Sequence, residues 1–194
     1  MYKRQDITVS WENLYAINRK IIDPIAHRYF FVWEPVELTV YECPYEGEVS
    51  VSLPLHPDKP EEGHRTLTIA YRDGGARFLI SGQDATNMEP GRLVRLMGLF
   101  NIEVLEVGGR SVKARFHSEE LKVAREEKAS LIHWLPIQGN VVVEVLRPDG
   151  TVEGFGEPDL AKEGVGSLVQ LVRYGFGRVD EVGDGFVRIC YAHK

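Results

Sequence analysis

Two long polar side chains, Gln170 and Arg173, interrupt an apolar run near the end of this 194-residue chain. The run, residues 167–177, alternates as a β-strand does, so positions 170 and 173 would point to opposite faces and cannot both face a dry core. Gln and Arg supply the forked hydrogen-bonding groups that fit base edges and phosphates. Tyr174 and Phe176 are nearby candidates for stacking on an unpaired base, although we expect Phe176 to pack in the core. The segment is therefore a candidate for binding unstacked RNA bases.

A further basic residue, Arg28, lies beside the aromatic residues 29–31. Taken alone, this arrangement favours a surface arginine above an aromatic cluster in a barrel wall. A role for Arg28 in binding depends on its meeting Gln170 and Arg173 in the fold.

No combination of residues indicates an active site. The six histidines lack metal-ligand spacing, and neither a nucleophile elbow nor a phosphate-binding loop is present in the sequence. The carboxylate pairs at 61–62 and 119–120 fall in charged, loop-like stretches, where we expect solvated surface. Cys43 and Cys190 form no C-x-x-C pair, so we expect no zinc site and two reduced thiols, with a disulfide as the alternative.

The clearest predicted helix covers residues 10–23. Ser10 is a suitable N-cap, and Pro24 ends the helical pattern. The apolar residues at helical spacing are Leu14, Ile17, Ile21 and Ile22. The charged stretch 118–129 fits a second short helix and an exposed connector equally well.

Most of the remaining sequence predicts strands. Residues 36–40, 66–71 and 141–146 alternate clearly, and turn signals separate the alternating runs. The turn signals lie at 73–75, 108–109, 148–150 and 183–185. Many short strands with close turns indicate an antiparallel barrel or sandwich, because closure or stacking protects strand edges.

Composition and charge narrow the classes of partner. Hydrophobic residues make up 43% and charged residues 27% of the chain, which is typical of a globular protein, and no apolar run is long enough for a membrane helix. The net charge of −6 argues against a general nucleic-acid binder. It is compatible with a protein that gathers basic residues at one site.

Several segments together resemble the C-terminal anticodon-binding region of archaeal-type glutamyl-tRNA synthetases, which is similar to that of glutaminyl-tRNA synthetases. Residues 55–65 carry a His-Pro-x-x-Pro-x-x-Gly-x-Arg pattern, for which we expect a structural role: Pro57 and Pro60 stiffen the loop, and Arg65 fixes it. The other segments are residues 9–32, 94–102, 132–134, 154–158, 173–176 and 193–194.

The resemblance implies a mainly β fold of two antiparallel, ribosomal L25-like β-barrels packed end to end, with an N-terminal helix. It divides the chain into a helical connector at 1–27, a first barrel region at 28–117 and a second at 118–194. We expect the last strands of the second region to return to the first barrel.

By the same resemblance, Arg28, Gln170 and Arg173 surround the middle anticodon base, a uridine. Arg95 corresponds to a position associated with the first base, although an outward-facing strand residue is an equal alternative. The position for the third base falls near Asn87, where the glutaminyl enzymes have an arginine. This difference favours a glutamyl enzyme and leaves open whether tRNA-Gln is also accepted.

The implied function is anticodon recognition within a cytoplasmic, monomeric glutamate–tRNA ligase that binds tRNA-Glu and neither DNA nor a membrane. We expect no catalytic residue, metal or cofactor in this part, with ATP and magnesium used by a catalytic domain that is absent from this chain. One alternative is a free-standing L25-like RNA-binding barrel, and another is a β-barrel interaction module without RNA.

Overall fold

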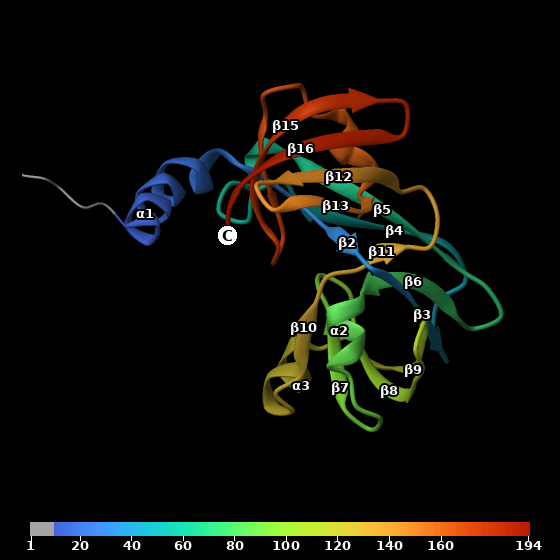
Figure 1. Cartoon of the computed structure of the whole chain (residues 1–194). Helices are drawn as coiled ribbons and strands as arrows, with labels where there is room; N and C mark the ends of the chain where they lie inside the picture. Colours follow the sequence, from blue (N-terminus) through green and yellow to red (C-terminus); the bar gives the residue numbers. More distant parts are fainter. Residues whose placement is uncertain (1–9) are drawn as a thin grey trace, which may run out of the picture.

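β-Strands make up most of residues 10–194, the part of the chain that this computed structural model describes. They form two seven-stranded sheets and one two-stranded sheet. Figure 1 shows the two large sheets curling into lobes, one above the other, with the helix α1 (Trp11–Ile22) projecting to the side. The predicted mainly β fold of two barrel-like sheets with an N-terminal helix is confirmed.

The first barrel is the sheet with strand order β10-β7-β8-β9-β3-β6-β11. Large apolar side chains fill its interior, and Phe78, Phe100 and Trp134 are fully buried there. Two short helices, α2 (Gly82–Thr86) and α3 (Leu121–Glu126), connect its strands. The strands are β3 (Pro35–Tyr41), β6 (Ala76–Ser81), β7 (Leu93–Leu96), β8 (Asn101–Val107), β9 (Ser111–Ser118), β10 (Ser130–Ile132) and β11 (Leu135–Pro136).

The second barrel is the sheet with strand order β1-β14-β15-β16-β12-β13-β2. Phe31 and alternate valines of β12 form its core, because successive strand residues point to opposite faces. The 3-10 helix η3 (Pro158–Lys162) follows β13. The strands are β1 (His27–Tyr29), β2 (Phe31–Trp33), β12 (Val141–Arg147), β13 (Gly150–Gly156), β14 (Leu168–Leu171), β15 (Gly175–Gly183) and β16 (Phe186–His193).

Each barrel is closed by one continuous segment of chain. In residues 27–33, β1 pairs with β14 at one edge of the second barrel and β2 pairs with β13 at the other. In residues 130–136, β10 pairs with β7 and β11 pairs with β6 in the same way. Both edges are thereby covered, which removes the unpaired backbone of an open sheet. Each segment then continues into the other barrel, as β3 and β12, so two crossing segments join the barrels.

This pairing differs from the predicted division at residue 118. Residues 27–33 belong to the second barrel and residues 130–136 to the first. The predicted return of the last strands to the first barrel is not seen in the strand pairing, because β15 and β16 pair with each other and with β14 and β12. The two crossing segments, residues 27–33 and 130–136, are what the barrels exchange. Each segment supplies two short strands to one barrel and then enters the other.

Both segments for which a helix was considered contain one in the structure. Helix α1 is capped by Ser10, which accepts a hydrogen bond from the Asn13 N–H at 3.2 Å, and it ends at Ile22 with Asp23 as its C-cap. The stretch 118–129 contains α3, so the helical alternative is confirmed. The sheets are mixed and not wholly antiparallel, because β1–β14, β3–β9, β7–β10 and β12–β16 pair in parallel.

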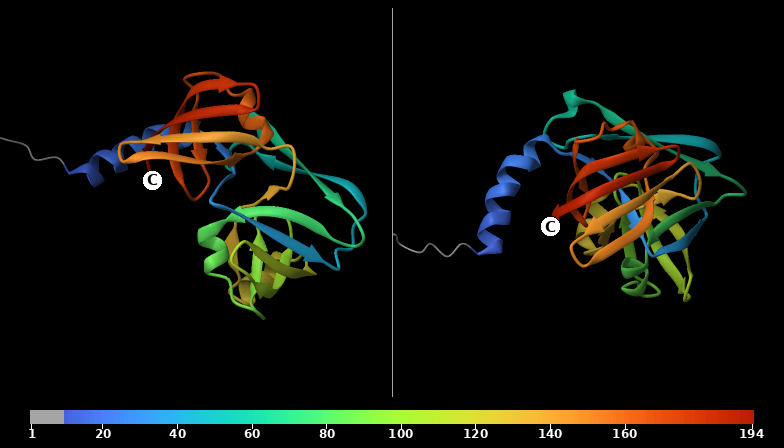
Figure 2. Two further views of the ribbon diagram at one scale, coloured as in Figure 1. Left: turned by 45° about the vertical axis from the view of Figure 1, so that its right-hand side comes forward. Right: turned by 45° about the horizontal axis from the view of Figure 1, so that its top comes forward.

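Helix α1 packs by one face only. Ile22 is buried, Asn18 hydrogen bonds to His193 at 3.0 Å, and the Arg19 guanidinium lies over the Phe176 ring. Figure 2 shows the helix lying beside the second barrel and outside both lobes. The exposed apolar residues of this helix and the turn after it are Trp11, Leu14, Tyr15, Ile17, Ile21 and Ile25.

The third sheet is a hairpin of β4 (Gly47–Pro54) and β5 (His64–Tyr71) that reaches both barrels. Alternate residues of β5 are buried, and Leu67 and Ile69 pack in the core of the first barrel. At its other end, the Leu55 carbonyl accepts a hydrogen bond from the Arg28 N–H at 2.8 Å. The hairpin therefore fixes β1 relative to the first barrel.

The loop between β4 and β5 carries the His-Pro-x-x-Pro pattern and the 3-10 helix η2 (Pro60–Glu62). His56 is buried, and its Nε2 donates to the Asp23 carbonyl at 3.0 Å while its Nδ1 accepts from the Asp58 N–H at 3.2 Å. These bonds hold the loop against η1 (Asp23–Ile25), which ends α1. These contacts come from His56, which the prediction did not name, whereas the predicted contribution of Arg65 is seen in its hydrogen bond to the Pro54 carbonyl.

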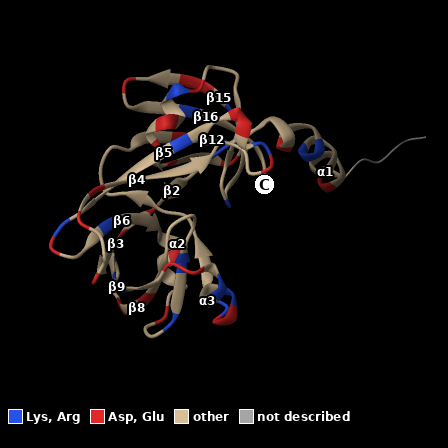
Figure 3. Cartoon of the chain, turned by 180° about the vertical axis from the view of Figure 1, so that it is seen from behind, with Lys and Arg blue, Asp and Glu red and all other residues tan. Residues whose placement is uncertain are grey.

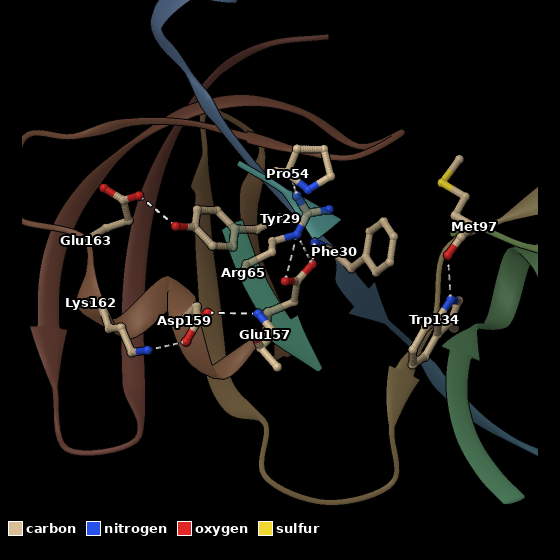
Figure 4. A network of polar contacts seen from close by, with 11 residues as sticks. Tyr29, Phe30, Pro54, Arg65, Met97, Trp134, Glu157, Asp159, Lys162 and Glu163 are labelled. Atoms are coloured by element: carbon tan, nitrogen blue, oxygen red, sulfur yellow. Dashed lines mark hydrogen bonds and ion pairs between the residues drawn. The ribbon is translucent and has the colours of Figure 1, made fainter. Parts of the chain in front are cut away.

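A buried ion pair holds the chain where it passes from β1 to β2. Arg65 Nε lies 2.9 Å from a carboxylate oxygen of Glu157, and the same oxygen accepts the Phe30 N–H at 2.6 Å (Figure 4). Arg65 also donates to the Pro54 carbonyl, and its guanidinium lies over the Phe30 ring. Burial raises the pKa of Glu157 to about 7, so its charged form depends on these donors.

We expect Arg65→Met to destabilise the chain by about 3–5 kcal/mol, because it leaves the buried Glu157 without its cation. The double variant Arg65→Met/Glu157→Gln should recover much of this loss, since an amide oxygen can still accept the Phe30 N–H. Urea unfolding followed by circular dichroism measures both. A loss below about 1 kcal/mol in the single variant would show that the pair does not hold the junction.

Candidate RNA-binding pocket at the barrel junction

Arg28 and Gln170 lie side by side although they are far apart in the sequence. They are register partners in the parallel pairing of β1 with β14. Both line an open pocket of about 340 Å³. Its other walls come from the β4–β5 hairpin and from the turn between β7 and β8. The pocket therefore lies where the two barrels and the hairpin meet.

The polar lining of this pocket is made by Arg28, Gln170 and Arg65, and the Arg65 guanidinium is already paired with Glu157. The Arg28 side chain is 26% exposed, and one of its terminal nitrogens lies 3.2 Å from the Asp23 carboxylate. Its Nε is buried and has no hydrogen-bond partner among residues 10–194. Gln170 is partly exposed, and its amide can both donate and accept. A ligand with neighbouring donors and acceptors can satisfy both side chains.

Arg173 lies outside strand geometry, which corrects the prediction of one strand over residues 167–177. The run is a hairpin: β14 ends at Leu171, the Tyr174 N–H donates to the Leu171 carbonyl at 2.9 Å, and β15 starts at Gly175. Arg173 adopts a left-handed conformation with φ of 66°. A Cβ at Gly175 would lie 2.7 Å from the His193 carbonyl oxygen, so the close packing of this turn needs glycine.

The Arg173 guanidinium points toward the first barrel. Two of its nitrogens lie 2.6 and 2.7 Å from the carboxylate oxygens of Asp84 on α2, a bidentate ion pair. A third contact, 3.3 Å long, joins Arg173 to His133 Nδ1. Arg173 is therefore not grouped with Arg28 and Gln170 in the pocket lining, although Val172 beside it is. It bridges the barrels and keeps about 37% of its side chain exposed.

His133 completes this bridge from the crossing segment 130–136. Its Nε2 lies 2.7 Å from the Phe31 carbonyl oxygen and 3.1 Å from Ser81 Oγ. A carbonyl oxygen only accepts, so Nε2 carries the proton and Nδ1 accepts from Arg173. Burial, reinforced by Arg173, lowers the pKa of His133 to about 4, so the imidazole is neutral near pH 7.

The Arg95 guanidinium makes hydrogen bonds within the first barrel. It donates to the Asn101 amide oxygen at 3.1 Å and to the Glu119 carbonyl at 2.7 Å. Burial lowers the pKa of Arg95, and the residue does not line the pocket. Asn87 is exposed at the C-cap of α2, three residues after Asp84.

The two aromatic candidates pack inside the protein. Phe176 is 2% exposed and contacts Ile22 and Ala26, so its predicted core role is confirmed. Tyr174 packs edge-on against Phe31 in the second barrel. The two cysteines are free, as expected.

Sequence reasoning missed Asp84, His133 and Met97. Asp84 carries no motif, and its partner Arg173 becomes apparent only in the fold. The spacing of the histidines does not reveal that His133 hydrogen bonds to Arg173, Ser81 and the Phe31 carbonyl at the junction. Met97 lines the pocket from the tight turn between β7 and β8, which the segment 130–136 holds in place.

Charge is distributed over the whole molecule. Figure 3 shows basic and acidic residues interspersed on both barrels. Within residues 10–194, no group of three His, Cys, Asp or Glu side chains is arranged to hold a metal ion. None of the helices in this range has the length and hydropathy of a membrane span.

Comparison with protein families gives the class of domain to which this fold belongs. Residues 26–119 and residues 131–180 each match families described as tRNA synthetases class I (E and Q), anti-codon binding domain. The chain belongs to this family of anticodon-binding domains, as the sequence resemblance predicted.

Its relatives are archaeal glutamate–tRNA ligases. The enzyme of Methanopyrus kandleri is 47% identical over 189 residues, which is 97% of this chain and 33% of that protein. The enzyme of Pyrococcus furiosus is 44% identical over 196 residues, covering 99% of this chain and 32% of that protein. The Methanocaldococcus jannaschii enzyme is 43% identical, with 99% and 33% covered. The chain thus spans about a third of the length of these relatives.

The low pKa of His133 predicts a pH-dependent stability. The folded pKa of about 4 lies below the ordinary value of 6.5, so the contribution is fully present above pH 6.5 and is lost as the pH falls toward 4. The difference corresponds to about 3 kcal/mol. In urea titrations from pH 7 to 4, His133→Gln should lose this much less stability than the wild type. Parallel pH profiles would contradict the neutral assignment.

Proposed function

We propose that this chain recognises the anticodon of tRNA-Glu, with the middle uridine in the pocket lined by Arg28 and Gln170. The observation that carries the proposal is the direct register pairing of these two residues at the mouth of a pocket between the barrels. Anticodon bases are splayed from their loop when bound by proteins of this kind, so a pocket of this size suits one base.

The chemistry of the pocket fits uracil. Uracil presents acceptors at O4 and O2 and a donor at N3, and the Gln170 amide offers the complementary pair. Arg28 supplies donors from its partly exposed guanidinium to a carbonyl or an adjacent phosphate. Arg173 and Arg95 each retain guanidinium donors beyond their internal bonds. We assign Arg173 to the middle nucleotide, where it can hold an adjacent phosphate, and Arg95 to the first.

In this proposal the chain works within a cytoplasmic, monomeric glutamate–tRNA ligase that joins glutamate to tRNA using ATP and magnesium. We assign ATP and magnesium to another part of that enzyme, as the family resemblance implies. The apolar face of α1 suits a helix that is covered in such a longer protein. Whether tRNA-Gln also binds is decided by titrating both tRNAs.

We expect Arg28→Ala and Gln170→Ala each to weaken binding of tRNA-Glu by about 1–3 kcal/mol. The loss should be smaller for a tRNA-Glu whose middle uridine is replaced by cytidine, because the lost contacts read that base. Calorimetric titration at fixed salt measures both affinities.

The matched controls are Arg178→Ala and Gln138→Ala, which remove exposed side chains that do not line the pocket. They should leave both affinities nearly unchanged. Equal losses for the two tRNAs in the pocket variants would mean that Arg28 and Gln170 contact only the backbone. Equal binding of all tRNAs by the wild type would refute anticodon recognition itself.

A further inference from the structure

The wall of the pocket contributed by the first barrel is apolar. It is formed by Met97 and Gly98, in the turn between β7 and β8. Val172 and Leu53 extend this apolar lining from β14's end and from the hairpin. The pocket therefore has a polar side, made by Arg28 and Gln170, and an apolar side that a flat ring could lie against.

The turn is held rigidly by the segment that closes the first barrel. The Met97 N–H donates to the Ile132 carbonyl at 2.9 Å, and the Met97 carbonyl accepts the Trp134 indole N–H at 2.9 Å (Figure 4). Trp134 is fully buried, so its indole cannot exchange this partner for water. Within the turn, the Leu96 N–H donates to the Phe100 carbonyl at 3.0 Å. The backbone of Met97 is thus fixed on both sides.

Gly98 allows the turn to lie directly against the hairpin. Its φ of +69° is a left-handed conformation that favours glycine. A Cβ at this position would lie only 2.4 Å from Leu53 Cδ2. Since Leu53 also lines the pocket, any side chain at position 98 would push Leu53 from its place. The distance between the apolar wall and the polar side is therefore set by packing.

We propose that the turn of Met97 and Gly98 is the specificity-determining wall for the middle anticodon base. The Met97 side chain covers one face of the base, and the fixed turn sets how far that face lies from Arg28 and Gln170, so that the edge of uracil meets the Gln170 amide. This inference rests on the proposed anticodon recognition and adds a selection by shape to the hydrogen bonds of Arg28 and Gln170. A flexible thioether suits this role because it follows the surface of a ring.

Affinities of the 194-residue chain for four tRNA-Glu transcripts that differ only in the middle base test this proposal. Met97→Ala should reduce the preference for uridine over adenosine by about tenfold or more, because the shortened side chain widens the pocket. Met97→Leu keeps an apolar wall of similar size and should retain the preference within about threefold. Thermal unfolding of each variant confirms that the comparison is made on folded protein.

A second measurement needs no variant. The chain contains three methionines, and ¹³C-methyl labelling gives each its own signal. On adding tRNA-Glu, the Met97 methyl should shift upfield, since it would lie on the face of an aromatic base. Met88, buried in the core of the first barrel, is the internal control and should stay in place.

The outcomes of these experiments distinguish the proposed role of Met97 from the proposed anticodon recognition on which it rests. Suppose that the wild type prefers uridine and that Gln170→Ala removes this preference. If Met97→Ala then leaves the preference intact and the Met97 methyl does not shift, the role of Met97 is refuted while anticodon recognition stands. If the wild type shows no preference among the four transcripts, anticodon recognition fails and the wall fails with it. A lost preference in Met97→Ala, together with the methyl shift, supports both.

Discussion

The buried contact of Arg65 and Glu157 with the Phe30 backbone determines how the two barrels meet. At Phe30 the chain stops pairing with β14 and starts pairing with β13, so its N–H lies between two ladders. Glu157 satisfies that donor, and Arg65, from the hairpin, neutralises Glu157. A buried N–H and a buried carboxylate would each be costly alone. Together they let one segment close the second barrel and carry β1 against the hairpin.

The pocket is a consequence of this arrangement. Arg28 lies two residues before Phe30, and its N–H is bound by the hairpin. Gln170 is placed opposite by the parallel pairing of β1 with β14. The facing wall comes from the first barrel, whose own closing segment fixes Met97 through Trp134. Thus each crossing segment both closes a barrel and positions one side of the pocket. The Arg173–Asp84 ion pair adds a second link between the barrels.

The sequence predicted local structure well because the signals were local. Ser10 marked the start of α1, and alternation located strands such as β3, β5 and β12. Prediction from the sequence failed where contacts between distant segments determine the structure. The residues around Arg173 continue the alternation of a strand, and only the close packing around Gly175 requires the chain to change direction there. The closing segments are too short for periodicity to assign them to a barrel.

The site residues show the same difference between those that the sequence identifies and those that only the fold reveals. The resemblance selected Arg28 and Gln170 by residue type and position, and the structure places them together. Neither Asp84 nor Met97 could be found in this way, because an aspartate in a short helix and a methionine in a turn carry no chemical pattern. Their importance arises from what the fold brings opposite them. Arg95 illustrates the converse, since its donors are partly used by Asn101 and Glu119 within the barrel.

Photo-crosslinking from the middle anticodon base tests most directly whether that base enters the pocket. A tRNA-Glu transcript carrying 4-thiouridine at this position is irradiated in complex with the chain, and the linked peptides are mapped by mass spectrometry. The structure leads us to expect links to the peptides containing Arg28, Met97 or Gln170, which converge on one pocket. Links confined to α3 or to the turn between β8 and β9, neither of which lines the pocket, would contradict it.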